Sequence, residues 1–235
     1  IRVNGKIVFS KSGNSMKTGD VFASNESLDF KSTDSRAAVI SKKRGRFVLT
    51  SKVAGNQKAN LIPAMNNISS RAGALLNKID LQNHFKGKYV VLGNQKLKIG
   101  DKAFPLTESK FFYLQYEYKG EVIRKKLNHA SGNHLLINAE NVFKVDGKKI
   151  SVEEKSMQLY YRDSEAKKSE NISTFTPVFP NLEELKVELE VIKSEYAEKN
   201  PKELKGEFTA YINQFYGKPD SDNLAEFLIA KMGMK

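Results

Sequence analysis

The hydrophobic period changes along this chain, and that change constrains its fold more than any other feature. Near the start, apolar residues alternate with polar ones, as in Ile1, Val3, Ile7 and Phe9. A period of two is typical of a half-buried strand. After Pro180, apolar residues recur every three or four positions, which is the period of an amphipathic helix. The sequence therefore predicts an α+β protein, mostly β, with its helices at the end.

Turn residues and composition divide the 235 residues into four segments. Residues 1–55 suggest a small antiparallel β meander or partial barrel, with strands near 1–10, 20–30, 36–41 and 46–51. Residues 56–87 form a partly helical connector, and residues 88–180 a β-sandwich-like domain. Residues 181–235 form a C-terminal helical appendage of three helices.

Two hairpins are expected in the sandwich-like segment. The run 89–92 faces 96–99 across Gly93-Asn94-Gln95, and the run 111–118 faces 122–127 across Lys119-Gly120. Further strands are expected at 157–162 and 172–179.

Helix-capping residues mark the three C-terminal helices. Asn181 precedes the first, Asn200 stands before Pro201 with Glu203 three residues on, and Asp220 opens the third. Their apolar stripe comprises Leu185, Leu189, Ile192, Phe208, Tyr211, Phe215 and Phe227. Because short helices cannot bury such stripes alone, the helices pack on each other, on the β region or on another chain.

Charge is distributed unevenly along the sequence. Residues 1–130 hold 24 Lys+Arg against 9 Asp+Glu, a net of +15, whereas residues 131–235 hold 15 against 18, a net of −3. This asymmetry predicts an anionic partner or an acidic protein neighbour for the basic half.

The first fifty residues also contain turn glycines in a recognisable order. These are Val3-Asn4-Gly5-Lys6, Lys17-Thr18-Gly19-Asp20, Leu28-Asp29-Phe30, then Ala37-Ala38-Val39-Ile40 and Gly45-Arg46-Phe47-Val48-Leu49. This segment resembles the β domain of FecR-type proteins over residues 1–51. The resemblance implies an interaction module of signal-transducing envelope assemblies, with no catalytic residues.

Two basic clusters are candidate binding sites for a polyanion or a partner. The first is Lys42, Lys43, Arg44 and Arg46 on an expected hairpin tip, where multivalent charge suits phosphate contacts. Alternatively, these residues form a solvated turn that blunts an edge strand.

The second cluster is Arg124, Lys125 and Lys126, beside a strand rich in Phe and Tyr. Cations interleaved with aromatic rings suit single-stranded nucleic acid. Alternating aromatics are also typical of a β-sandwich core, so both interpretations stay open.

No catalytic, metal or nucleotide signature is present in the sequence. His129 and His134 are five residues apart, which does not match helical ligand spacing, and Ser131 lacks the glycines of a nucleophile elbow. We therefore expect no catalytic residue, no metal and no small-molecule cofactor. A deep pocket that joins either histidine to a carboxylate would change this expectation.

Bulk properties leave the cellular location open. The chain has no cysteine and no apolar run long enough for a transmembrane segment. A cytoplasmic location is favoured, or a periplasmic or secreted one if a leader precedes Ile1.

These observations yield three functional hypotheses. The first is a non-enzymatic protein-interaction module, a structural or adaptor subunit that binds a protein partner or self-associates. The second is a nucleic-acid or polyanion binder that uses the turn 42–46 and the strand 124–126. The third is a hydrolase of unknown type.

Overall fold

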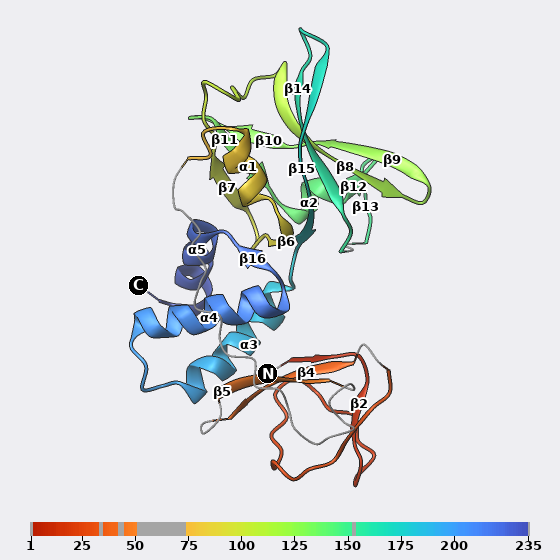
Figure 1. Cartoon of the computed structure of the whole chain (residues 1–235), viewed down its shortest axis with the longest axis vertical. Coiled ribbons are helices and arrows are strands. Elements are labelled where there is room, and N and C mark those ends of the chain that lie inside the picture. The colour runs from red at the N-terminus through yellow and green to blue at the C-terminus, as the bar shows by residue number, and fades with distance from the viewer. Residues whose placement is uncertain (1, 33–34, 42–44, 51–73, 152–153, 235) are drawn as a thin grey trace. The chain divides into compact units, whose positions relative to one another are not determined.

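A computed structural model describes residues 2–32, 35–41, 45–50, 74–151 and 154–234 of the chain. It is an α+β structure with more strand than helix and with helices α3–α5 at its end, as the sequence predicts (Figure 1). Among the described residues, no helix combines the length and the apolar character needed to cross a membrane.

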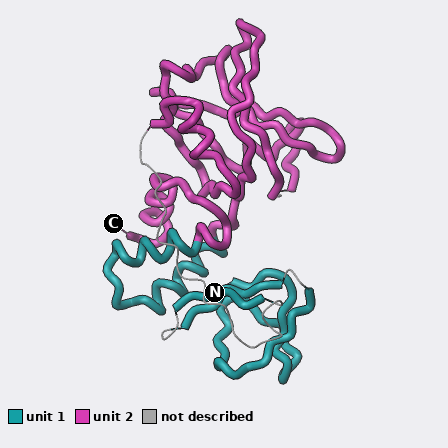
Figure 2. Tube along the Cα trace, viewed as in Figure 1, with its two compact units in different colours: residues 1–67, 183–211 teal, residues 68–182, 212–235 magenta. Residues whose placement is uncertain are grey.

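The chain forms two compact units, each assembled from two separate stretches of sequence (Figure 2). Unit 1 comprises residues 1–67 and 183–211, and unit 2 comprises residues 68–182 and 212–235. This arrangement differs from the expected four consecutive segments, because the C-terminal helices are shared between the units instead of forming one appendage.

Unit 1 combines short N-terminal strands with most of two helices. Its elements are β1 (Arg2–Asn4), β2 (Ile7–Phe9), β3 (Leu28–Phe30), β4 (Arg36–Ser41), β5 (Gly45–Thr50), α3 (Leu182–Glu195) and α4 (Pro201–Phe215). The strands form an antiparallel sheet in the order β1-β4-β5 and an antiparallel pair β2-β3. Ile7, Ala37 and Val39 lie in a common core. Burial is not strictly alternating here, because the neighbouring Val8 and Ala38 are also buried. The strand expected over 20–30 is limited to its last three residues.

Buried ion pairs join the N-terminal strands of unit 1 to its helices. Arg2 Nη1 lies 3.0 Å from Glu188 Oε1, and the Tyr211 hydroxyl donates to Glu188 Oε2 at 2.8 Å. The Arg46 guanidinium donates to Glu207 Oε2 from Nε at 3.2 Å and from Nη2 at 3.1 Å. Because the side chains of Arg46 and Glu188 are almost fully buried, each needs its partner.

The charge contrast between the two halves of the sequence is not a contrast between the two units. Unit 1 contains 17 Lys+Arg against 12 Asp+Glu, a net of +5, and unit 2 contains 22 against 15, a net of +7. The acidic helices belong to the same unit as the basic N-terminal strands. Each unit is therefore moderately basic.

Unit 2 is built on a six-stranded mixed sheet. Its elements are α1 (Lys78–His84), β6 (Gly87–Val90), β7 (Gln95–Lys98), β8 (Lys110–Tyr118), β9 (Glu121–Lys126), β10 (Asn128–Ala130), β11 (His134–Ile137), α2 (Ala139–Val142), β12 (Lys144–Val145), β13 (Lys148–Lys149), β14 (Met157–Asp163), β15 (Lys168–Val178), β16 (Lys218–Pro219) and α5 (Ser221–Met232). The large sheet has the order β16-β6-β15-β14-β8-β9, and a second sheet has the order β10-β11-β7. Both sheets contribute to one core, for example Leu97 and Leu135 from the second and Leu114 and Leu159 from the first.

One of the two expected hairpins is wrong and the other is confirmed. β6 and β7 do not pair with each other, because β6 lies parallel to β15 and β16 while β7 pairs with β11. Local turn residues around Gly93 therefore do not decide which strands pair. β8 and β9 form the antiparallel hairpin predicted across Lys119-Gly120.

The capping residues of the last two helices act as the sequence indicates. The Asn200 side chain accepts from Glu203 N at 3.0 Å, and Glu203 accepts from Asn200 N at 3.2 Å, which is a reciprocal capping box. Asp220 Oδ1 accepts from the backbone N–H groups of Asp222 and Asn223 at the start of α5.

The ion pair between Arg46 and Glu207 allows a stability test. Replacing Glu207→Gln removes the charge opposite a buried guanidinium, so we expect the free energy of unfolding to fall by about 3 kcal/mol. Urea denaturation followed by circular dichroism measures this change. Glu190→Gln is the matched control, because Glu190 pairs with Lys186 on the exposed surface of α3 and should cost less than about 0.5 kcal/mol. Equal losses in the two variants would contradict a structural role for the buried pair.

Candidate functional site

Strand β8 separates its side chains onto two faces of the large sheet in unit 2. Phe112, Leu114 and Tyr116 are buried in the core, whereas Phe111, Tyr113 and Gln115 are half-buried on the opposite face. This division follows from the period of two in a strand. The opposite face, which we call the outer face, comprises the following side chains of β8, β9 and β14: Phe111, Tyr113, Gln115, Glu117, Val122, Arg124, Lys126, Gln158, Tyr160 and Arg162.

Hydrogen bonds connect the polar side chains across the outer face. Arg124 Nε donates to Gln115 Oε1 at 2.8 Å, and Gln115 Nε2 donates to Gln158 Oε1 at 3.0 Å. The Tyr160 hydroxyl donates to the same Gln158 oxygen at 3.2 Å. These bonds cross from β9 through β8 to β14 and hold the side chains in fixed positions.

Aromatic rings lie beside cations on the same face. The rings of Tyr113 and Tyr160 stack with centroids 5.0 Å apart and planes 6° apart. Lys126 Nζ lies 4.5 Å from the centroid of the Phe111 ring, within the range of a cation–π interaction. The outer face thus presents rings and positive charges to the solvent instead of an apolar surface.

Positive charge exceeds negative charge on the outer face. Its three cations are Arg124, Lys126 and Arg162, and its carboxylate is Glu117. Glu108, which forms a 3.2 Å ion pair with Lys126, has a side chain that is 94% exposed. A pair so exposed stabilises little, so an anion can compete with Glu108 for Lys126.

Strand β9 also leaves one edge of the large sheet free among the described residues. Leu127 N donates to Phe112 O at 2.9 Å, and bonded pairs alternate with non-bonded pairs in an antiparallel ladder. In this register, Tyr113 and Lys126 form a pair without backbone hydrogen bonds, and so do Gln115 and Arg124. The backbone N–H and C=O groups of Val122, Arg124 and Lys126 therefore point away from β8.

The two predicted basic clusters have different outcomes. Lys42, Lys43 and Arg44 lie outside the described residues, and Arg46 is buried against Glu207, so its guanidinium does not face a partner. Arg124 and Lys126 lie on the outer face, while Lys125 Nζ donates to the backbone oxygen of Lys144. The aromatic residues beside them divide between the two sides of the sheet, because alternate residues of β8 face the core and the outer face. Stacking of the outer rings with nucleic acid stays a prediction.

The apolar stripe of the C-terminal helices is covered within the chain. Its buried members are Leu185, Leu189, Ile192, Phe208, Tyr211 and Phe227, and Phe215 is half-buried. Folding of the chain already removes the buried members from water, as expected for helices that pack on each other or on the β region.

The sequence did not single out the residues that β14 contributes. Gln158, Tyr160 and Arg162 alternate with the core residues Leu159 and Tyr161, which the expected strand at 157–162 contains. Their alternation was a signal for an outward face. Their position beside β8 was not visible, because the order of strands depends on long-range pairing.

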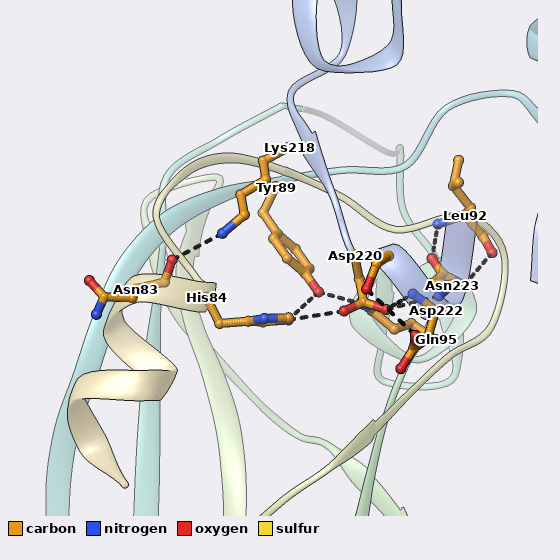
Figure 3. A network of polar contacts seen from close by, with 10 residues as sticks. Asn83, His84, Tyr89, Leu92, Gln95, Lys218, Asp220, Asp222 and Asn223 are labelled. Carbon is orange, nitrogen blue, oxygen red and sulfur yellow. Dashed lines mark hydrogen bonds and ion pairs between the residues drawn. The ribbon is translucent and has the colours of Figure 1, made fainter. Parts of the chain in front are cut away.

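The histidine that lies close to a carboxylate is His84, and not His129 or His134. Among the described residues, no hydrogen bond or ion pair joins His129 or His134 to a carboxylate, and His134 Nδ1 lies 2.9 Å from the Ser131 carbonyl oxygen. His84 instead lies in a buried network with Tyr89, Gln95 and Asp220 in unit 2 (Figure 3). The Nε2 atom of His84 is 2.6 Å from the Tyr89 hydroxyl and 3.9 Å from Asp220 Oδ2.

Protonation states follow from the donors and acceptors in this network. Gln95 Nε2 donates to the Tyr89 oxygen, so the Tyr89 hydroxyl donates its own proton to a neutral His84 Nε2. Burial, and then the positive charge of Lys218, lowers the pKa of His84 to about 4. Burial raises the pKa of Tyr89 well above its usual value, and nearby Asp220 adds to this effect. At neutral pH the 3.9 Å contact with Asp220 is therefore not an ion pair.

The network fixes the start of α5 to strand β6 and the loop that follows it. Asn223 accepts from Leu92 N at 2.8 Å and donates to Leu92 O at 3.0 Å, beside the Asp220 cap (Figure 3). Its members are buried and bond to one another, which is the behaviour of a structural polar core. We therefore assign this network to stability.

An open depression of about 500 Å³ lies in unit 1 beside β2. Its lining includes Phe9, Lys17, Asp20 and the exposed Val21. Asp20 accepts a hydrogen bond from the backbone N–H of Lys17 at 2.8 Å and so already serves a turn. This depression brings together no histidine with a carboxylate.

No family model matches this chain, and no curated protein matches its sequence significantly. The outer face with its free β9 edge is the candidate functional site because of its geometry and charge alone.

The buried histidine gives a prediction about pH. In the unfolded chain His84 takes up a proton near pH 6.5, whereas the folded unit takes it up only near pH 4. Since the unfolded state binds more protons between these values, the free energy of unfolding falls as the pH falls through this window. We expect His84 to lower it by about 2 kcal/mol between pH 8 and pH 5.

Urea denaturation from pH 5 to pH 8 measures this dependence. His84→Gln keeps an acceptor for Tyr89 and removes the titrating group, so the variant should lose this part of the pH dependence. His129→Gln, at a partly exposed histidine on β10, should keep the wild-type dependence. A wild-type pH dependence in His84→Gln would show that His84 is not the group responsible.

Proposed function

We propose that this protein is a non-enzymatic interaction module, a structural or adaptor subunit of a larger assembly, which binds its partner through the outer face of unit 2. The observation that supports this proposal is the combination of hydrogen-bonded polar side chains, stacked rings and excess positive charge on a sheet face whose side chains are half-buried or exposed. Tyrosine and arginine are enriched at the centres of protein interfaces. The resemblance of residues 1–51 to FecR-type β domains is consistent with such a role and adds no catalytic residue.

Self-association is less favoured than binding to an acidic partner. The net charges of +5 and +7 give two units of the same sign, so a head-to-tail contact between copies gains little from net electrostatics. A partner with acidic residues fits the outer face better than a second copy does.

A polyanion binder is the second candidate, and one observation favours it specifically. Arg124 and Lys126 lie on β9, next to the β8 strand whose Tyr113 stacks with Tyr160 of β14. Cations beside aromatic rings are a combination that proteins use to bind single-stranded nucleic acid. The turn 42–46 contributes less than expected to this candidate, since Arg46 is neutralised by Glu207.

Photo-crosslinking tests the proposed surface and separates the two candidates. Tyr113 on the outer face, or Val187 on the surface of α3 as the control, is replaced by p-benzoylphenylalanine in cells that make the protein. We expect a crosslinked product from position 113 and at least about fivefold less from position 187, because only the outer face binds the partner.

The chemistry of the crosslinked product identifies the partner class. If the mass that crosslinking adds to the chain is removed by protease and not by nuclease, the partner is a protein, which supports the interaction module. If nuclease removes the added mass, the partner is a nucleic acid, which supports the polyanion binder. Equal yields from positions 113 and 187 would contradict the outer face as the binding surface.

A further inference from the structure

Strand β9 combines three properties that together suggest how a partner binds. It is the last strand of the six-stranded sheet, it is rich in positive charge, and its outward backbone groups have no partner among the described residues. We propose that β9 binds an extended acidic peptide segment of a partner protein, which adds to the large sheet as a further strand. This inference rests on the proposed interaction function and names its mode and its partner chemistry.

The backbone provides the attachment. The N–H and C=O groups of Val122, Arg124 and Lys126 have no partner in the part of the chain that the structure describes, and they can form a new ladder along the edge. An added strand satisfies these groups in the same way that β8 satisfies the groups of Ile123 and Lys125. The Val122 side chain, which is 60% exposed, gains apolar contact from a neighbouring strand.

The side chains of β9 determine which strand fits. On the outer face, an added strand places alternate residues beside Arg124 and Lys126, and acidic residues there are favoured by opposite charge. On the core side, the remaining residues lie beside Ile123, which packs at the margin of the hydrophobic core, and beside Lys125, whose Nζ donates to the Lys144 backbone oxygen. A β-branched residue fits beside Ile123. The expected ligand therefore alternates acidic and β-branched residues.

The same charges disfavour a second copy of this strand. Arg124, Lys125 and Lys126 are consecutive cations, and like charges across a new strand pair are destabilising. Positive residues on an edge strand protect it from pairing with itself, while an acidic strand is still accepted. Charge complementarity thus selects an acidic partner.

The direct test uses a fluorescein-labelled peptide of eight residues that alternates Glu with Val and Thr. Fluorescence anisotropy with the full chain measures its affinity at low ionic strength. A matched peptide is methylated on the backbone nitrogen of every second residue. It has the same charge and side chains, but it cannot donate backbone hydrogen bonds from one edge of the strand that it forms. We expect the methylated peptide to bind at least about tenfold more weakly, because strand addition needs its N–H groups.

A variant on the protein side tests the same edge. Since the Arg124 N–H points away from β8, proline at this position removes a docking donor without removing a bond within the sheet. We expect Arg124→Pro to weaken peptide binding about tenfold, and Arg124→Gln, which keeps the N–H, to weaken it about threefold. Amide hydrogen exchange supplies a readout that does not depend on variants. The N–H groups of Val122, Arg124 and Lys126 should become protected when the wild-type chain binds the peptide.

Failure of strand addition can be distinguished from failure of the proposed interaction function. Equal affinity for the plain and methylated peptides, or no protection at the three amides, would overturn strand addition, whereas crosslinking from position 113 would still support an interaction surface. An oligothymidylate of 20 nucleotides provides the last comparison. If it binds more tightly than the peptide and Arg124→Pro does not weaken it, the acidic-peptide proposal fails in favour of the polyanion binder.

Discussion

Within each of the two units, buried polar groups bond to partners that are far away in the sequence. In unit 1, Glu188 and Glu207 from the helices meet Arg2 and Arg46 from the first strands. In unit 2, Asn223 bonds both backbone groups of Leu92. An unpaired buried charge or amide costs several kcal/mol of folding free energy. These contacts therefore require that segments near the end of the chain pack against segments near its start.

Because distant segments pack together, the distribution of charge in the folded units differs from its distribution along the sequence. The basic N-terminal strands and the acidic helix α3 lie in the same unit, where Arg2 and Arg46 pair with Glu188 and Glu207, and unit 1 keeps a net charge of +5. Arg46 illustrates the effect, since a residue that resembled a phosphate contact is a buried structural cation. In the proposed function, the positive charge that binds the partner is the modest excess on the outer face of unit 2.

The β9 edge and most of the outer face belong to one element of the fold, the β8–β9 hairpin, and β14 contributes the remaining outer-face side chains. The same alternation that buries Phe112 and Leu114 leaves Tyr113 and Gln115 toward the solvent beside Arg124. The hydrogen-bond pattern that joins β9 to β8 also turns the backbone of Arg124 outward. Side-chain chemistry and backbone availability therefore coincide on one strand, which is why both proposals centre on it.

The amino-acid sequence by itself determined the local elements of this protein. Period-two and helical patterns predicted the α+β class, the β8–β9 hairpin and the capping residues Asn200 and Asp220, because these features depend on neighbours a few residues away. Only the tertiary structure decided the pairing of β6 with β15, the burial of Arg46 and the meeting of His84 with Asp220. Those contacts join residues that are distant in sequence. They form only where the folded chain removes both polar partners from water at the same place.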